Sequence, residues 1–124
     1  KIKKIRPTDR IITKEQVEKI QTYVESERPY LNPSLTLRSL AEQVNIHPNQ
    51  LSWILNESIG QNFNEFINKK RIEHFKQVVI DPDNAHISLI GLAYESGFNS
   101  KTVFNTAFKK EVGMTPKAFQ KSQT

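Results

Sequence analysis

Amide and hydroxyl side chains gather around two apolar positions, Leu51 and Leu55, whose spacing is that of one buried helical stripe. The outward positions around this stripe are Asn49, Gln50, Ser52, Trp53 and Asn56. Asn and Gln can pair bidentately with adenine in the major groove of DNA, and an indole can lie on thymine methyls or sugars. These residues are therefore candidates for base contacts, while Trp53 is also open to a packing role between helices.

A second polar group of this kind follows in the C-terminal half of the chain. It surrounds Phe104 and Phe108, which have the same apolar spacing. Its outward positions are Lys101, Thr102, Asn105 and Thr106. Lys can donate to guanine, and a Thr methyl can contact the methyl of thymine. The pattern predicts two base-reading surfaces in one chain.

Helices must position both groups, and the sequence marks where they begin and end. Thr36 and Ser88 are expected N-caps of short helices, and Asn45 and Gly97 stand where these helices must end. The helix that follows the turn at Gly97 is expected to have Asn99 as its N-cap. Each turn is about three or four residues long, which is the length found in helix-turn-helix motifs.

The two helix pairs match one another along the sequence. The first matched residues are Thr36, Leu37, Leu40, Ala41, Asn45 and Ile46, and their counterparts 52 positions later are Ser88, Leu89, Leu92, Ala93, Gly97 and Phe98. Caps and stops recur together with core residues, so an internal repeat explains the match better than the general periodicity of a helical bundle. The sequence thus predicts an all-α fold with helix-turn-helix lobes at about residues 36–60 and 88–113.

A long linker helix is predicted between the lobes, over residues 62–80, with a capping signature at Asn62 and Glu65. At ~1.5 Å per residue it spans roughly 27 Å, and major-groove segments on one face of B-DNA lie about 34 Å apart. The helix is suited to hold two lobes over adjacent groove segments. A helix from Thr13 and a final helix over residues 115–122 bring the total to about seven.

Basic residues are unevenly distributed. The 18 Lys and Arg residues exceed the 13 Asp and Glu residues by five. Residues 1–10 and 69–124 each carry a net charge of +4, whereas residues 11–68 carry −3. A basic surface favours an anionic partner. Because residues 47–60 contain no Lys or Arg, the second motif is expected to supply most of the electrostatic attraction.

Phosphate contacts supply much of the affinity of proteins for DNA. The candidates are the helix N-termini at Thr36, Ser88 and Thr115 and the cations Lys69, Lys70, Arg71, Lys109, Lys110, Lys117 and Lys121. Any single Lys in this set is equally compatible with an ordinary solvated surface charge.

The composition argues against other classes of protein. The chain has no Cys, and its three His residues are scattered without a metal-binding or catalytic spacing. We therefore expect no enzyme, metal, cofactor or small-molecule ligand in this domain. The remaining alternative is a helical module that binds protein or RNA through the same basic surface. RNA recognition would favour exposed aromatic side chains, and only Trp53 clearly qualifies.

The stretch from Ile87 to Phe119 resembles the DNA-binding domain of the AraC/XylS family of bacterial transcription regulators. The similarity lies in the spacing of Ala93, Gly97 and Phe98, in the Phe-Lys-Lys that follows the second recognition helix, and in Gly-Met-Thr-Pro at 113–116. The first motif and the linker helix match as well, so the resemblance covers about residues 30–121.

The resemblance implies an AraC-type domain over residues 13–124 that binds double-stranded DNA and regulates transcription in the bacterial cytoplasm, usually by activation. The family's base contacts map onto Asn49, Ser52 and Trp53 in the first motif, and onto Lys101, Thr102, Val103 and Thr106 in the second. RNA polymerase is an implied partner. A separate N-terminal sensing or dimerisation region is also implied, to which residues 1–12 would be a basic linker or arm; an unstructured end is the other interpretation of these residues.

Several positions depart from the family pattern. The family commonly has Ser at His47, Gly at Asn45 and Arg at Thr106, and it often has basic residues at positions 56 and 57. These differences leave the fold expectation intact but put the DNA sequence read by either motif in doubt. Gly91, inside a predicted helix, has no explanation at this level.

Overall fold

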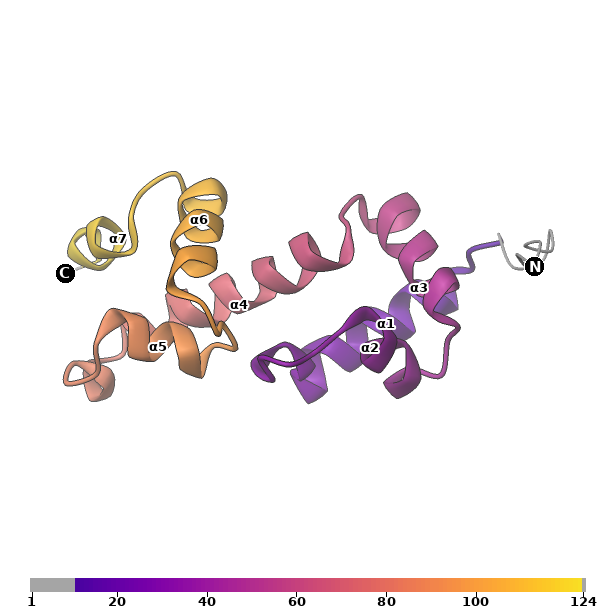
Figure 1. Ribbon diagram of the computed structural model, residues 1–124, viewed down its shortest axis with the longest axis horizontal. Coiled ribbons are helices and arrows are strands. Elements are labelled where there is room, and N and C mark those ends of the chain that lie inside the picture. Colours follow the sequence, from indigo (N-terminus) through magenta and orange to yellow (C-terminus); the bar gives the residue numbers. More distant parts are fainter. Residues whose placement is uncertain (1–10, 124) are drawn as a thin grey trace. The chain divides into compact units, whose positions relative to one another are not determined.

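A computed structural model describes residues 11–123, which form a succession of helices (Figure 1). The elements are α1 (Lys14–Glu27), η2 (Pro29–Leu31), α2 (Leu37–Gln43), α3 (Pro48–Ile54), η3 (Leu55–Ile59), α4 (Phe63–Val79), η4 (Pro82–Asn84), α5 (Leu89–Glu95), α6 (Lys101–Val112) and α7 (Pro116–Ser122). Seven of them are α-helices, and no strand occurs within residues 11–123. The predicted all-α class is confirmed. Residues 1–10, most of the expected basic arm, lie outside the described residues.

The chain divides into two compact units, and helix α4 contributes to both. Among the described residues, unit 1 contains 11–29 and 35–66, and unit 2 contains 30–34 and 67–123. Unit 1 thus holds α1, α2 and α3, and unit 2 holds α5, α6 and α7. Each unit contains one of the two predicted helix-turn-helix motifs.

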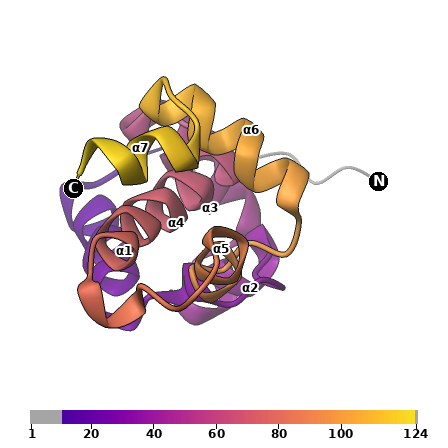
Figure 2. The same cartoon turned by 90° about the vertical axis from the view of Figure 1, so that its left-hand side faces the viewer.

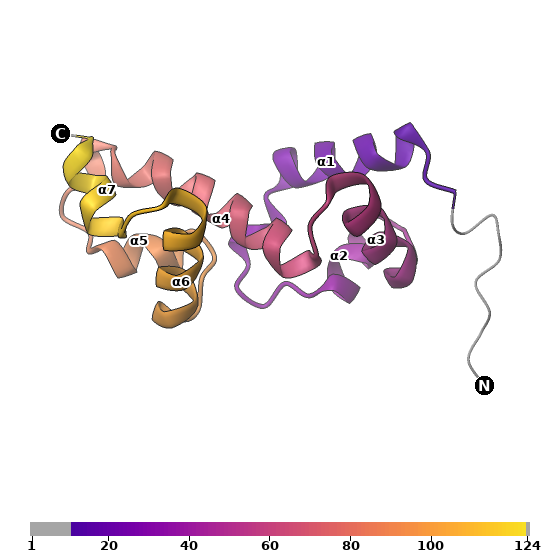
Figure 3. The ribbon, with the colours of Figure 1, turned by 90° about the horizontal axis from the view of Figure 1, so that it is seen from above.

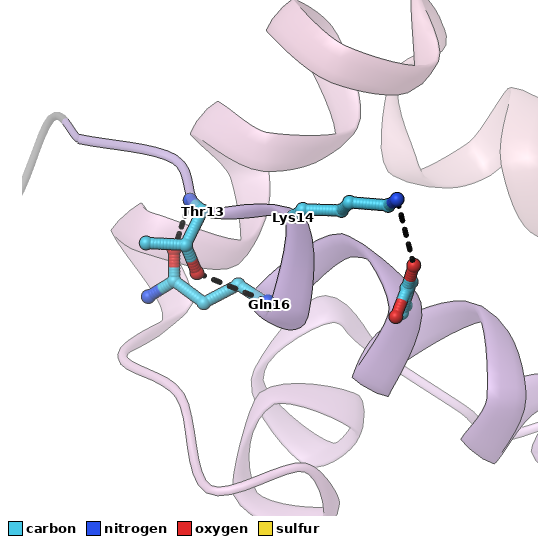
Figure 4. Close-up of polar contacts among 4 residues, drawn as sticks. Thr13, Lys14 and Gln16 are labelled. Atoms are coloured by element: carbon cyan, nitrogen blue, oxygen red, sulfur yellow. Dashed lines mark hydrogen bonds and ion pairs between the residues drawn. The ribbon is translucent and has the colours of Figure 1, made fainter.

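Unit 1 begins with a capping box at Thr13, where the sequence predicts the start of a helix. The Gln16 N–H donates to the Thr13 hydroxyl and the Thr13 N–H donates to the Gln16 side chain, both at 3.1 Å (Figure 4). Arg28 adopts a left-handed conformation, with φ of 51°, so α1 ends at Glu27, two residues before Pro29. The buried apolar residues of this unit are Ile20, Val24, Leu35, Leu40, Ala41, Val44, Leu51, Ile54, Leu55 and Phe66.

Unit 2 is organised around aromatic side chains. Phe75, Phe98, Phe104, Phe108 and Phe119 belong to one buried cluster, in which Phe75 and Phe104 have ring centroids 4.8 Å apart. Several of these pairs meet edge to face, the arrangement that aromatic rings favour. Helices α5, α6 and α7 lie around the C-terminal part of α4 (Figures 2 and 3). The Phe residues at helical spacing therefore fill the core, as the sequence indicated.

Helix α4 occupies the range expected of the linker helix. Its N-terminus carries the predicted box, in which Asn62 N–H donates to the Glu65 carboxylate at 2.9 Å and Glu65 N–H donates to the Asn62 side chain at 2.8 Å. Its 17 residues span about 26 Å at ~1.5 Å per residue. Within residues 11–123, no helix combines the length and apolar character needed to cross a membrane.

Candidate nucleic-acid interface

The first motif consists of α2, a tight turn and α3. Thr36 caps α2, and the turn is closed by two backbone bonds, from Ile46 N–H to the carbonyl of Ala41 at 2.9 Å and from Asn45 N–H to that of Glu42 at 3.2 Å. Asn45 has a φ of 56°, which confirms the left-handed helix stop expected there.

His47 caps α3 through its imidazole. The Asn49 N–H donates to Nδ1 of His47 at 3.1 Å, and Pro48 occupies the first helical position, where a missing N–H costs no hydrogen bond. Nδ1 of His47 thus accepts the capping bond at the position where the family commonly has a Ser. The cap fixes where the recognition helix begins.

The outward face of α3 and of the turn that follows it carries the polar residues that the sequence indicated. Leu51, Ile54 and Leu55 are fully buried, while Asn49 and Asn56 are exposed and Gln50 and Ser52 are partly exposed. Trp53 is 39% exposed, so its indole is available at the surface even though part of it is covered.

After Ile54 the helix widens into the π-helical turn η3, which ends at Gly60 with a φ of 80°. Asn56 lies in this turn, and its side-chain amide donates to the carbonyl of Ser52 at 2.9 Å. The amide of Asn56 is therefore partly occupied within the helix, which the sequence pattern did not indicate.

The second motif repeats the turn of the first with the same bonds. Phe98 N–H donates to the carbonyl of Ala93 at 3.1 Å and Gly97 N–H to that of Tyr94 at 3.0 Å. Gly97, like Asn45, has a positive φ, here 105°. Equivalent hydrogen bonds at equivalent residues support the internal repeat.

The structure corrects the predicted N-cap of α6 and gives a reason for Gly91 in α5. Ser100, not Asn99, caps α6 by accepting a bond from Val103 N–H at 3.2 Å. The helix starts one residue later than expected because the Ser hydroxyl, not the Asn amide, reaches the third helical N–H. Gly91 now has an explanation: a Cβ there would lie 3.0 Å from the Ser88 hydroxyl, which accepts the bond from Gly91 N–H.

Helix α6 presents a nearly continuous polar face. The predicted base contacts Lys101, Thr102, Val103, Asn105 and Thr106 are all exposed, Val103 at 46%. Phe104 and Phe108 are buried on the other side. Helix α6 is therefore anchored in the core by its aromatic side, and its other side presents short donor, acceptor and methyl groups to solvent.

The candidate phosphate contacts fall into three groups. Lys109, Lys110, Lys117 and Lys121 are exposed near the ends of α6 and α7, and Lys70 is partly exposed on α4. Lys69 forms an ion pair with Glu111 at 3.7 Å, across exposed side chains. The hydroxyls of Thr36, Ser88 and Thr115 accept bonds from the third N–H of α2, α5 and α7. These caps leave the earlier N–H groups of each helix without intrahelical partners.

Arg71 differs from the other candidates because its guanidinium is engaged inside unit 2. Nε donates to the carbonyl of Tyr30 at 2.7 Å and Nη2 donates to that of Asn32 at 3.0 Å. Desolvation lowers the pKa of Arg71 from its usual value, but an Arg side chain stays protonated at neutral pH. Its contacts indicate a structural role that sequence reasoning missed, because cations of α4 look alike in the sequence.

His74 of α4 also makes a hydrogen bond within unit 2. Its Nδ1 lies 2.9 Å from the hydroxyl of Ser96, which itself donates to the carbonyl of Leu92 at 2.8 Å. Because that hydroxyl hydrogen is used, Nδ1 of His74 is the donor in this pair. The hydroxyl of the fully buried Ser96 thus both accepts and donates a hydrogen bond.

Comparison with known proteins identifies this architecture. A helix-turn-helix domain family model matches residues 40–122. An uncharacterized HTH-type transcriptional regulator of Staphylococcus aureus (strain COL) is 30% identical over 110 residues, which are 89% of this chain and 14% of that protein. The melibiose operon regulatory protein of Escherichia coli (strain K12) is 30% identical over 88 residues, which are 71% of this chain and 28% of that protein. The chain thus spans between 14% and 28% of the length of these relatives.

Two of the solved structures with the same fold are C-terminal domains of response regulators. The C-terminal domain of AraT from Geobacillus stearothermophilus has a TM-score of 0.72 at 25% identity, covering 86% of this chain and 84% of that one. The C-terminal domain of yesN from Fusobacterium nucleatum has a TM-score of 0.68 at 27% identity, covering 83% and 95%. With the family model matched over most of the sequence, the chain belongs to the AraC-type helix-turn-helix DNA-binding domains of transcription regulators, a family of binding proteins and not of enzymes.

Proposed function

We propose that the chain is the output domain of a bacterial cytoplasmic transcription regulator whose helices α3 and α6 read adjacent major-groove segments of double-stranded DNA. The observation that carries this proposal is the exposed face of α6, where Lys101, Thr102 and Thr106 stand opposite a buried aromatic side. Helices of this kind enter the major groove with their N-terminal residues towards the base edges. Lys and Thr at these positions supply a donor for guanine and methyl groups for thymine.

In the proposed complex, α3 reads the other groove segment with fewer charges. Asn49 and Trp53 are exposed there, with Gln50, Ser52 and Asn56 beside them. The amide of Asn56 must leave its bond to the Ser52 carbonyl before it can pair with a base. We therefore assign the base reading of α3 chiefly to Asn49, Gln50 and Trp53.

Phosphate contacts hold the two helices in register in this proposal. Lys109 and Lys110 lie in the last turn of α6, Lys117 and Lys121 on α7 and Lys70 on α4. Thr36, Ser88 and Thr115 mark further backbone contacts at helix starts. Lys69 contributes less to the affinity for DNA because it must first separate from Glu111. The difference is small, since an exposed ion pair of this kind is worth only about 0–1 kcal/mol. Arg71 is removed from the set because its donors serve unit 2.

The wider role also belongs to the proposal. The relatives are several times longer than this chain, and two neighbours are C-terminal domains of response regulators. This supports a separate sensing or dimerisation region in the intact protein. Activation through RNA polymerase is proposed from the family resemblance and from the regulatory role that the melibiose operon protein's name states.

Selection of bound sequences from a random pool of DNA duplexes tests the function directly. We expect enrichment of two short elements whose centres are about 10 base pairs apart, one helical turn. A parallel pool of single-stranded RNA serves as the comparison. Enrichment of RNA alone, or of no duplex sequence, would favour the helical interaction module and reject DNA reading.

A further inference from the structure

Arg71 of α4 holds a segment of chain that lies far from it in the sequence. Its Nε and Nη2 donate to the carbonyls of Tyr30 and Asn32 at 2.7 and 3.0 Å, and its guanidinium carbon lies 5.9 Å from the centre of the Phe98 ring. The planar fork of an Arg side chain suits two neighbouring acceptors, which a Lys ammonium cannot match. We call the bonds from Arg71 to these two carbonyls the Arg71 clamp.

The turn of the second motif completes the clamp. A Cβ added to Gly97 would lie 2.0 Å from the Tyr30 carbonyl oxygen and 2.8 Å from Nε of Arg71. Only a glycine allows this carbonyl to approach so closely. Tyr30 itself is buried, so the segment 30–34 is packed as well as hydrogen bonded. The clamp is therefore a close-fitting part of unit 2.

The clamped segment is also the connection between two helices of unit 1. Only residues 28 and 29 separate α1 from Tyr30, and only residues 35 and 36 separate Ser34 from α2. The chain therefore passes between the units at three places, before residue 30, after residue 34 and within α4. The Arg71 clamp thus ties the middle of the connection between α1 and α2 to unit 2.

We propose that Arg71 is a positioning residue: by fixing residues 30–34 to unit 2 it limits the arrangements open to the two units, and so sets which spacing between two DNA elements the chain accepts. This inference rests on the proposed function. When two binding modules are joined, their combined affinity depends on whether the connection lets both engage at once. A clamped connection should favour one spacing, and a loose connection should tolerate several.

The substitution Arg71→Lys isolates the clamp from the charge. It retains a cation on α4 but cannot satisfy both carbonyls with one fork. Arg71→Met is a second variant, which keeps an apolar side chain in the half-buried site and removes the donors. Lys76→Arg is the matched control, because Lys76 lies on the same helix against the ring of Phe119, 5.7 Å from its centre.

Binding is measured on the duplex selected for the native chain, on versions with the spacer lengthened or shortened by two base pairs, and on a duplex with one element. The native chain and Lys76→Arg are expected to lose about tenfold or more in affinity when the spacer changes. Arg71→Lys and Arg71→Met are expected to lose less than about threefold on the same change, while all four bind the single element equally. Equal spacing dependence in all four proteins would overturn the positioning role.

Amide hydrogen exchange gives a readout that does not depend on DNA. In both Arg71 variants the amides of residues 31, 32 and 34 are expected to exchange faster, while those of Phe104 and Phe108 keep their protection. Unchanged exchange in the segment would show that the clamp does not hold it, and would overturn the proposal. If the native chain binds no duplex, the proposed function fails and the positioning role fails with it. If the native chain binds its duplex and the Arg71 variants keep the same spacing preference, the positioning role alone fails.

Discussion

At the scale of single residues, the chain separates side chains that serve the fold from side chains left for a partner. Phe104 and Phe108 are buried, whereas their neighbours Lys101 and Thr102 extend from the first turn of α6 without covering the core. Removing such an exposed side chain should change recognition and leave stability almost intact. That difference makes the exposed residues good test positions.

The substitution Lys101→Ala is expected to weaken binding to the selected duplex by about 1–3 kcal/mol and to relax the base preference at one position. The reason is that a Lys in the first turn of a recognition helix can donate to guanine O6 and N7. Affinities for the duplex and its single-base variants provide the measurement. A uniform loss across all variants would make Lys101 a phosphate contact, and no loss would remove it from the interface.

Trp53 offers an intrinsic reporter because it is the single Trp of the chain. Its 39% exposure places part of the indole in water, so covering it with a duplex should change its fluorescence. We expect the emission to shift when the selected duplex is added and to stay constant with a duplex of unrelated sequence. No response to either duplex would support the packing interpretation of Trp53.

At the scale of elements, the two turns show what the sequence could and could not predict. The helices, their stripes and most caps follow from local patterns, and the paired stops at Asn45 and Gly97 were predicted from the repeat. The sequence did not predict why one stop is Asn and the other Gly. The reason is a contact with residues far away in the chain, the Tyr30 carbonyl against Gly97, which local spacing does not encode.

The candidate contacts with DNA could be predicted from the sequence as exposed positions. The hydrogen bonds of Arg71 and Asn56 could not, because they depend on tertiary or π-helical geometry.

Gly97→Ala is therefore expected to cost much more stability than the same change at another left-handed glycine. Gly113 has a φ of 83° with no atom within 4 Å of an added Cβ, so Gly113→Ala carries only the conformational penalty of about 1–2 kcal/mol. Gly97→Ala adds an overlap with backbone and should cost about 3 kcal/mol or more. Urea unfolding of the two variants gives the comparison. Equal losses would mean that the segment 30–34 moves away without resistance, which contradicts the close fit described above.

At the scale of the whole molecule, charge divides along the sequence. Residues 11–68 carry a net charge of −3 and residues 69–124 carry +4. A DNA-binding surface drawn mainly from the second motif would explain this asymmetry, since each cation on a phosphate releases counterions from the duplex. The salt dependence of binding then measures which cations take part.

Replacing both Lys109 and Lys110 by Ala is expected to lower the slope of log K against log salt by up to about two units, because each lost phosphate contact removes about 0.9. Both residues lie in the last turn of α6, where they also complement the helix dipole. A reduced slope would show that the two Lys residues contact phosphates. Loss of the interaction with the helix dipole would change the stability of the protein and not the release of counterions. The matched control replaces Lys14 and Lys19 of α1, which removes the same charge from unit 1. An equal reduction in the control would mean that net charge alone, and not contact by α6, governs the attraction to DNA.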